Sequence, residues 1–249
     1  MTAILALEEV TVRFGGVTAV DNVSLRLDDG DLVGFIGPNG AGKTTLMRAI
    51  TGMVRPERGR VLLSGQDLTA WPVHRRIRAG LALAQQIVQP LRDLTLIENV
   101  ALAAGRRHTD HPWRAMWRRG RDPERRRARD LLELVGIQEA AEARPSTLPL
   151  GFLKRLEVAR ALALEPRLLL LDEPLAGLNQ GEARALADLI RDLNAQGQTI
   201  LLIEHNLREV TRICPSLYVQ DNGKPLARGT TDEVMADPAV RRAYLGGKD

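Results

Sequence analysis

The sequence predicts an α/β domain in which helices cover a mostly parallel sheet, with a helical segment inserted between its strands. Several runs of strand length are apolar on both faces and lead through polar turns into helical patterns, as strands buried in a parallel sheet do. Between about residues 85 and 163, helical spacing replaces the strand signal. These helices are either a separate insertion or the crossover helices of one sheet, and the insertion is the simpler interpretation.

The first part of the chain carries a strand–turn–helix pattern. Apolar residues alternate near the N-terminus and indicate a strand there: Leu5, Leu7, Val10 and Val12. A compact apolar run at 32–37 predicts a second strand, which ends in glycine. Residues 44–52 then have helical spacing and close on a glycine, which is typical of a helix end.

Two further apolar runs, at 167–174 and 199–205, have strand length and are followed by polar turns. Before them, the sequence Asp-Pro-Glu at 122–124 predicts a helix start, because it supplies a capping oxygen, a first-turn proline and an acid near the positive end of the helix dipole. We expect this helix to run to Gly136.

Composition excludes several classes of protein. Hydrophobic residues make up 44% of the 249 residues, which excludes disorder as the overall state, and no window approaches the roughly 18 consecutive apolar residues of a membrane span. The start of the chain has no basic region ahead of an apolar stretch, so we expect no secretory signal. The single cysteine, Cys214, builds neither an internal disulfide nor a cysteine zinc site, which favours a reducing cytoplasm.

A glycine-rich turn at 37–45, GPNGAGKTT, matches the phosphate-binding pattern G-x-x-x-x-G-K-[ST]. In such a loop, backbone N–H groups face phosphate oxygens, the lysine reaches the β- and γ-phosphates, and the threonine hydroxyl binds Mg²⁺. The loop follows a predicted strand and opens a predicted helix, as this mechanism requires. The candidate nucleotide-binding residues are Gly37, Pro38, Asn39, Gly40, Ala41, Gly42, Lys43, Thr44 and Thr45, with Thr44 also a metal ligand.

Asp172 and Glu173 stand at the polar end of the apolar run at 167–174. An aspartate there supplies a second anchor for Mg²⁺, and the adjacent glutamate can orient or deprotonate an attacking water. Two solvated acids at a strand end would be the simpler explanation of this pair alone. Because a phosphate loop lies on the same chain, hydrolysis of a nucleotide with Mg²⁺ is the better prediction, and the family resemblance below implies that the nucleotide is ATP.

With these motifs, the sequence resembles the ATP-binding subunits of ABC transporters over nearly all of its 249 residues. The resemblance implies a P-loop NTPase (RecA-like) core with an N-terminal antiparallel β subdomain and an inserted α-helical subdomain. It places the nucleotide-binding core at about 1–84 and 164–249, and the helical subdomain at about 85–163. The order of motifs, the arginine-rich insertion and the ending AYLGG are most similar to the branched-chain amino-acid subgroup, which implies amino-acid import.

The resemblance also assigns roles to single residues. Phe14, in a glycine-flanked turn, matches the aromatic residue that stacks on adenine, with a core phenylalanine as the alternative. Gln86 stands where the family has its Q-loop glutamine and would contact Mg²⁺ and water, with Gln85 as an adjacent competitor. His205 matches the switch histidine that contacts the γ-phosphate. Glu173, His205 and Gln86 are thus the expected catalytic residues.

The segment LPLGF at 148–152 aligns with the family signature LSGGQ, which faces ATP held by the opposite subunit, and 176–179 aligns with the D-loop. Gly151 is kept, but Pro149 replaces serine and Phe152 replaces glutamine. A proline offers neither a hydroxyl nor an N–H to the γ-phosphate. Loss of one such donor costs about 3 kcal/mol, a hundredfold in rate. We expect an impaired site, unless backbone N–H groups around Gly151 suffice.

These uneven motifs favour a heterodimer with a second ATPase subunit over a homodimer. The partner's complete signature would then serve this chain's phosphate loop, while LPLGF would face an impaired site on the partner. Other expected partners are ABC permease subunits at the cytoplasmic face of the membrane and, indirectly, a periplasmic or extracellular substrate-binding protein. No nucleic acid is expected.

Two other classes of protein are weighed against the transporter subunit. One is a soluble ABC-type ATPase that acts on nucleic acid or ribosomes, and such proteins generally carry a second ATPase domain or a long coiled coil. The sequence has one phosphate loop and no heptad run. The other is a regulatory module that binds nucleotide without hydrolysis, and the intact Glu173 argues against it.

The excess of positive charge is local. The chain has 35 Lys and Arg against 31 Asp and Glu, a net charge of +4, and residues 106–129 alone contain ten arginines and three acidic residues. The rest of the chain is therefore slightly acidic. We expect the basic segment to contact lipid headgroups or the permease, with a solvated surface as the close alternative and nucleic acid as a distant one.

Overall fold

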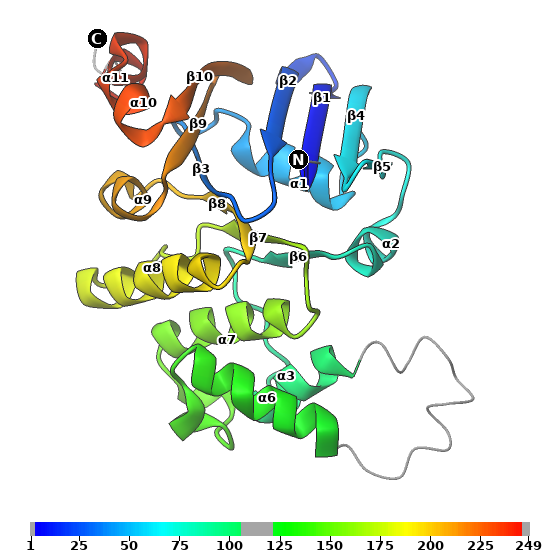
Figure 1. Ribbon diagram of the computed structural model, residues 1–249, viewed down its shortest axis with the longest axis vertical. Coiled ribbons are helices and arrows are strands. Elements are labelled where there is room, and N and C mark those ends of the chain that lie inside the picture. The colour runs from blue at the N-terminus through cyan, green and yellow to red at the C-terminus, as the bar shows by residue number, and fades with distance from the viewer. Residues whose placement is uncertain (1–2, 106–121, 246–249) are drawn as a thin grey trace.

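Two sheets and a group of helices make up the described part of the chain, residues 3–105 and 122–245 of a computed structural model (Figure 1). Figure 1 shows the antiparallel strands at one end of the molecule and three helices at the other, α3 (Leu96–Ala104), α6 (Asp122–Leu134) and α7 (Leu150–Leu162). Most of the larger sheet lies between these two groups, and its last two strands lie at the same end as the antiparallel strands. The predicted fold class is confirmed.

The smaller sheet is antiparallel and has the strand order β2-β1-β4-β5. Its first strand is the one that the alternating apolar residues predicted, and it pairs with the second from Leu5 opposite Leu27 to Phe14 opposite Val17. The strands are β1 (Leu5–Phe14), β2 (Val17–Leu27), β4 (Arg58–Leu63) and β5 (Gln66–Asp67).

The larger sheet has the order β10-β9-β3-β8-β7-β6, and every neighbouring pair in it is parallel except β9 with β10. Three of its strands are buried along their whole length, and these are the apolar runs predicted at 32–37, 167–174 and 199–205. The strands are β3 (Leu32–Ile36), β6 (Leu81–Ala84), β7 (Leu168–Asp172), β8 (Thr199–Ile203), β9 (Ser216–Asp221) and β10 (Lys224–Thr230).

The central strands of this sheet contribute to two separate hydrophobic cores. In β7, Leu168 and Leu170 pack into a core with the antiparallel sheet and α1 (Lys43–Thr51), whereas Leu169 and Leu171 pack into a core with α3, α6 and α7. Both faces of the strand must therefore be apolar, which explains its continuous apolar sequence.

The remaining helices of the described residues follow the strands in the order expected for an α/β fold. They are α2 (Val73–Arg78), α8 (Gln180–Ala195), α9 (Leu207–Ile213), α10 (Thr231–Ala236) and α11 (Pro238–Leu245), with 3₁₀ turns η1 (Gln138–Ala140) and η2 (Pro145–Thr147). Within the two described ranges, no helix is long and apolar enough to span a membrane.

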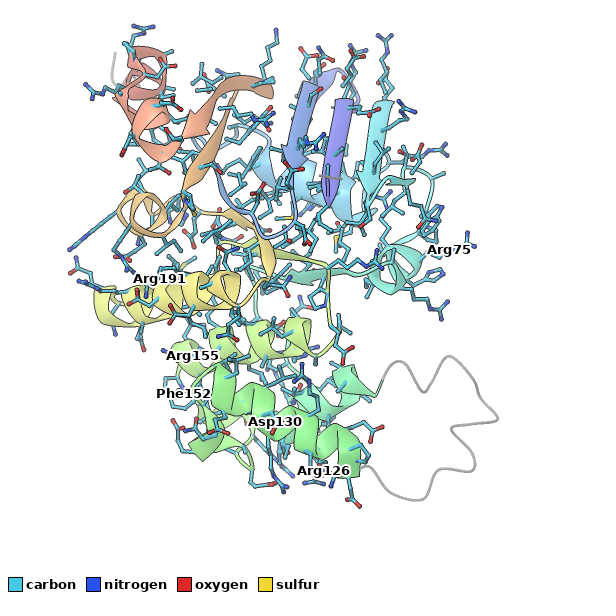
Figure 2. The ribbon with its side chains drawn as sticks, viewed as in Figure 1. Arg75, Arg126, Asp130, Phe152, Arg155 and Arg191 are labelled. Carbon is cyan, nitrogen blue, oxygen red and sulfur yellow. The ribbon has the colours of Figure 1, made fainter. Side chains whose placement is uncertain are left out.

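The helix predicted to start at 122–124 is α6, which ends at Leu134, two residues short of the predicted Gly136. The first part of the predicted basic segment, 106–121, lies outside the described residues. The rest of it belongs to α6, where Arg126 is exposed (Figure 2).

Arg76 of α2 locks the end of α1 in place. Its side chain is 1% exposed, and Nη1 donates to the carbonyl oxygens of Ala49 (2.7 Å) and Ile50 (2.8 Å) at the carboxyl end of α1. The other guanidinium nitrogens donate to the carbonyl oxygens of Thr69 and Trp71, both at 3.0 Å. A helix ends with carbonyl groups that have no intrahelical donor, and one guanidinium supplies donors to two of them here.

The change Arg76→Met should lower the free energy of unfolding by about 3 kcal/mol, because it leaves four carbonyl groups that accept from Arg76 without that donor. Urea denaturation measures this change. The matched control is Arg75→Met on the same helix. Its exposed guanidinium stacks on the Trp71 ring at 5.2 Å and should contribute less than about 1 kcal/mol. If the two changes lowered the free energy of unfolding equally, Arg76 would not stabilise the end of α1 through its hydrogen bonds.

Candidate nucleotide-binding site

The glycine-rich turn joins β3 to α1 and ends on Gly42, directly before the helix. The first N–H groups of α1 have no intrahelical acceptor and face the turn, which suits an anion. Gly42 has φ 97°, and a Cβ there would stand 2.1 Å from the Ala19 carbonyl oxygen of β2. Only glycine therefore fits at this position.

Lys43 is folded over this loop. Its Nζ donates to the carbonyl oxygens of Gly37 (2.7 Å) and Pro38 (2.9 Å). Burial lowers the pKa of Lys43, while the carboxylates of Glu173 and Asp172 act in the opposite direction. Phosphate oxygens entering the loop would offer this ammonium group better acceptors than two neutral carbonyl groups.

Gln220 of β9 braces the loop and was missed by the sequence analysis. Its side chain is fully buried, and Nε2 donates to the Ala41 carbonyl oxygen at 2.7 Å. The same oxygen also accepts from the Gly223 N–H at 3.0 Å. Gln220 lies 179 residues from Ala41 in the chain, and no motif marks it. The available signal was a polar residue next to the apolar run 217–219.

Asp172 ends β7 with its side chain buried, and its Oδ1 atom has no hydrogen-bond partner among the described residues. Burial, and then the neighbouring Glu173, raise the pKa of Asp172. Thr44, Gln86 and Asp172 line one cavity of about 180 Å³. A hydroxyl, an amide oxygen and a carboxylate with an unused oxygen are the ligand types that Mg²⁺ prefers, so these residues fit that ion.

The three residues predicted to be catalytic, Glu173, Gln86 and His205, lie together. The Glu173 Oε2 atom accepts a hydrogen bond from Gln86 Nε2 and lies 3.6 Å from His205 Nδ1. The Glu173 backbone has φ 47°, a left-handed conformation that costs a non-glycine residue about 1–3 kcal/mol. The Glu173 N–H donates to the Ile203 carbonyl oxygen of β8 at 2.9 Å, which holds this conformation in place.

Gln85 and Gln86 both line the cavity and are both exposed. The side chain of Gln86 reaches Glu173, and its backbone carbonyl oxygen accepts from Lys154 Nζ at 2.6 Å. These two contacts favour Gln86 over Gln85 as the residue that acts with Glu173.

Glu204 connects two loops of the site and was also missed from the sequence. Its buried carboxylate accepts from the backbone N–H groups of Leu175 (2.7 Å), His205 (3.1 Å) and Asn206 (3.4 Å). Burial raises the pKa of Glu204, and these hydrogen bonds partly offset the effect. An acid inside the apolar run before His205 was the available signal.

Lys154 of α7 is the third residue that could not be found from motifs, and its side chain is 4% exposed. Its Nζ donates to the backbone carbonyl oxygens of Gln86 and, at 3.3 Å, of Glu173. The chain contains only four lysines among its 35 basic residues, and two of them, Lys43 and Lys154, are buried at this site. The rarity of lysine in an arginine-rich chain was the signal that could have found Lys154.

Phe14 is the last residue of β1 and is 50% exposed. The alternative of a core phenylalanine is therefore wrong. The neighbouring strand β2 contacts the phosphate loop at Ala19, close to Gly42. This arrangement leaves Phe14 an exposed aromatic candidate for stacking on a base.

Pro149 and Gly151 stand at the start of α7. Pro149 precedes the helix and makes no side-chain capping bond, and a Cβ at Gly151 would lie 3.0 Å from Glu182 Oε1 of α8. Leu150 is a third departure from LSGGQ, where it replaces a glycine, and a Cβ on Gly177 would lie 2.9 Å from its Cδ2. In this first turn the Phe152 N–H donates to the Pro149 carbonyl oxygen at 3.1 Å.

Phe152, shown on α7 in Figure 2, packs partly buried against the core of α3, α6 and α7. A glutamine at this position would therefore lose apolar contacts as well as gain an amide. The structure thus gives the phenylalanine a packing role that the comparison with LSGGQ does not suggest.

Comparison with known proteins gives consistent results. The family model described as ABC transporter matches residues 20–176, and the one described as branched-chain amino acid ATP-binding cassette transporter matches residues 224–249. The chain is 40% identical over 249 residues to the high-affinity branched-chain amino acid transport ATP-binding protein LivG of Salmonella typhimurium, with 98% of each chain covered. It is 35% identical to the lipopolysaccharide export system ATP-binding protein LptB of Acidithiobacillus ferridurans, over 99% of this chain and 98% of that one.

Among solved structures, the ADP conformation of MJ1267, an ATP-binding cassette of an ABC transporter, superposes with a TM-score of 0.86. The two sequences are 30% identical, and the match covers 99% of this chain and all of the other. From the fold, the phosphate loop and these matches together, the chain belongs to the ABC transporter family, as one of its ATP-binding cassettes.

Proposed function

We propose that this chain binds and hydrolyses ATP to drive the import of branched-chain amino acids through separate permease subunits, at the cytoplasmic face of the membrane. The observation that carries the proposal is the joint placement of Glu173, Gln86 and His205 beside Asp172 and the phosphate loop. The substrate class is supported by the names of the relatives, LivG first, and by the family match at 224–249.

The chain's own residues account for each step of hydrolysis. The phosphate loop binds the phosphates through backbone N–H groups, Lys43 neutralises charge on the β- and γ-phosphates, and Phe14 stacks on adenine. Glu173 accepts a proton from the attacking water, while Gln86 orients that carboxylate. His205 then holds the γ-phosphate during in-line attack.

Thr44, Asp172 and Gln86 would hold Mg²⁺. The ion supplies charge neutralisation at the phosphates when bound.

We further propose that the chain works as a heterodimer. Its phosphate loop, Asp172 and Glu173 are complete, whereas the 148–152 segment lacks the serine, one glycine and the glutamine of LSGGQ. A partner with a complete signature would restore full activity at this chain's ATP site, and the helical segment at about 85–163 would transmit closure to the permease.

The change Glu173→Gln should lower kcat about a hundredfold or more, because the amide cannot accept a proton, while ATP still binds. Steady-state ATPase assays of the assembled transporter and binding of a fluorescent ATP analogue measure the two effects. The matched control is Glu9→Gln, an exposed glutamate that also has a left-handed backbone, φ 50°. An unchanged rate in Glu173→Gln would remove this residue from the role.

The change Asp172→Asn should raise the Mg²⁺ concentration for half-maximal activity about tenfold, because a neutral amide binds the ion less tightly. ATP binding measured in EDTA should not weaken. Titration of Mg²⁺ at saturating ATP tests this, and an unchanged midpoint would exclude Asp172 as a ligand.

The double change Pro149→Ser with Phe152→Gln should raise the ATPase rate of the assembled transporter by at most about twofold. In the proposed heterodimer this chain's own site already turns over with the partner's signature, and the change restores donors only at the partner's site. Phe152→Gln alone serves as the control for lost packing. An unchanged rate in the double variant would mean that the backbone N–H groups of α7 suffice.

A further inference from the structure

Lys154 joins α7 to two segments of the ATP site. Its ammonium group donates to the carbonyl oxygens of Gln86 at 2.6 Å and Glu173 at 3.3 Å. Further along α7, Arg160 Nη1 donates to the Gln89 carbonyl oxygen at 3.0 Å. The segment between β6 and α3 is thus attached to α7 at two points.

Burial of the Lys154 ammonium group is energetically unfavourable. Its side chain is 4% exposed, and burial lowers its pKa, while carboxylates of Glu204, Glu173, Glu157 and Asp172 favour the charged form. An apolar side chain of similar length would fill the same space without the cost of removing an ammonium group from water. The lysine is therefore explained by its hydrogen bonds and not by packing.

The two carbonyl groups belong to the residues whose side chains meet in the site. The Gln86 amide donates to the Glu173 carboxylate, so their relative position decides where that carboxylate lies. Lys154 fixes the backbone of both residues from one point on α7. The same helix begins at Leu150, which lies against Gly177.

We propose that Lys154 is a positioning residue that couples the seating of α7 against a second subunit to the placement of the Glu173 carboxylate in this chain's own ATP site. The inference rests on the proposed function, in which the start of α7 faces the nucleotide of the partner. In this arrangement, one helix takes part in both ATP sites of the pair. Its first turn faces the ATP site of the partner, and Lys154 positions residues of this chain's own ATP site.

The test is a comparison of kcat and KM for ATP in the assembled transporter. Lys154→Met keeps an unbranched side chain that is one atom shorter and removes its donors. It should lower kcat about tenfold or more, because small misplacements of a catalytic group are costly. KM should change less than about twofold, since Lys154 donates to no atom of the phosphate loop. Lys154→Arg supplies a long cationic donor again and should recover part of kcat.

Arg155→Met is the matched control. Arg155 is the next residue on α7, and its guanidinium donates to the Val135 carbonyl oxygen at 2.8 Å, in the helical group (Figure 2). It should lower the melting temperature as much as Lys154→Met does, without the loss of kcat. Equal kcat values in the two variants, or a rise in KM as large as the fall in kcat, would overturn the proposal.

Hydrogen exchange gives a readout that needs no ATPase activity. Lys154→Met should speed amide exchange in residues 85–90 and 173–176, and Arg155→Met should not. If exchange in these segments is unchanged, Lys154 does not hold them and the proposal fails. If exchange responds but the wild-type transporter hydrolyses no ATP, the proposed function fails and the positioning contact stands.

Discussion

Parallel pairing of β3, β8 and β7 determines where the polar groups of the ATP site leave the sheet. Ile203 of β8 is paired with Phe35 on one side and with Asp172 on the other, so the three strands end at the same level. The turns that follow them therefore open at one edge, as in other α/β sheets that bind ligands at the carboxyl ends of their strands. The backbone hydrogen bonds of the sheet thus bring the polar residues of the site together, without requiring favourable interactions between their side chains.

The strands, the phosphate loop and the acidic pair could be predicted from the sequence because their signals are local. An apolar run with a polar end describes β7 and places Asp172 without knowledge of any partner. The buried polar contacts of Gln220, Glu204 and Lys154 could not be predicted in this way, since each of them has a partner that is distant in the chain, by 179, 29 and 68 residues respectively. No periodicity encodes such pairs, and only an unusual residue type at an apolar position hints at them.

The helices beside the ATP site pack into two different hydrophobic cores. The helix after the phosphate loop packs into one core with the antiparallel sheet, and α7 packs into the other with α3 and α6. Strands β3, β8 and β7 contribute to both cores, and the phosphate loop follows β3, so movement of the helical group would reach that loop through the sheet. Because a packed core resists gradual deformation, such movement is expected to occur between two defined arrangements.

The left-handed backbone of Glu173 makes this catalytic position a source of strain in the folded chain. Glycine or asparagine adopts that conformation with less strain, so replacing the glutamate would relieve the backbone and increase stability while removing the proton acceptor. Selection for expression level or heat resistance alone would then favour loss of this residue. A thermostable variant obtained without a transport assay is therefore best sequenced at position 173 before its rate is interpreted.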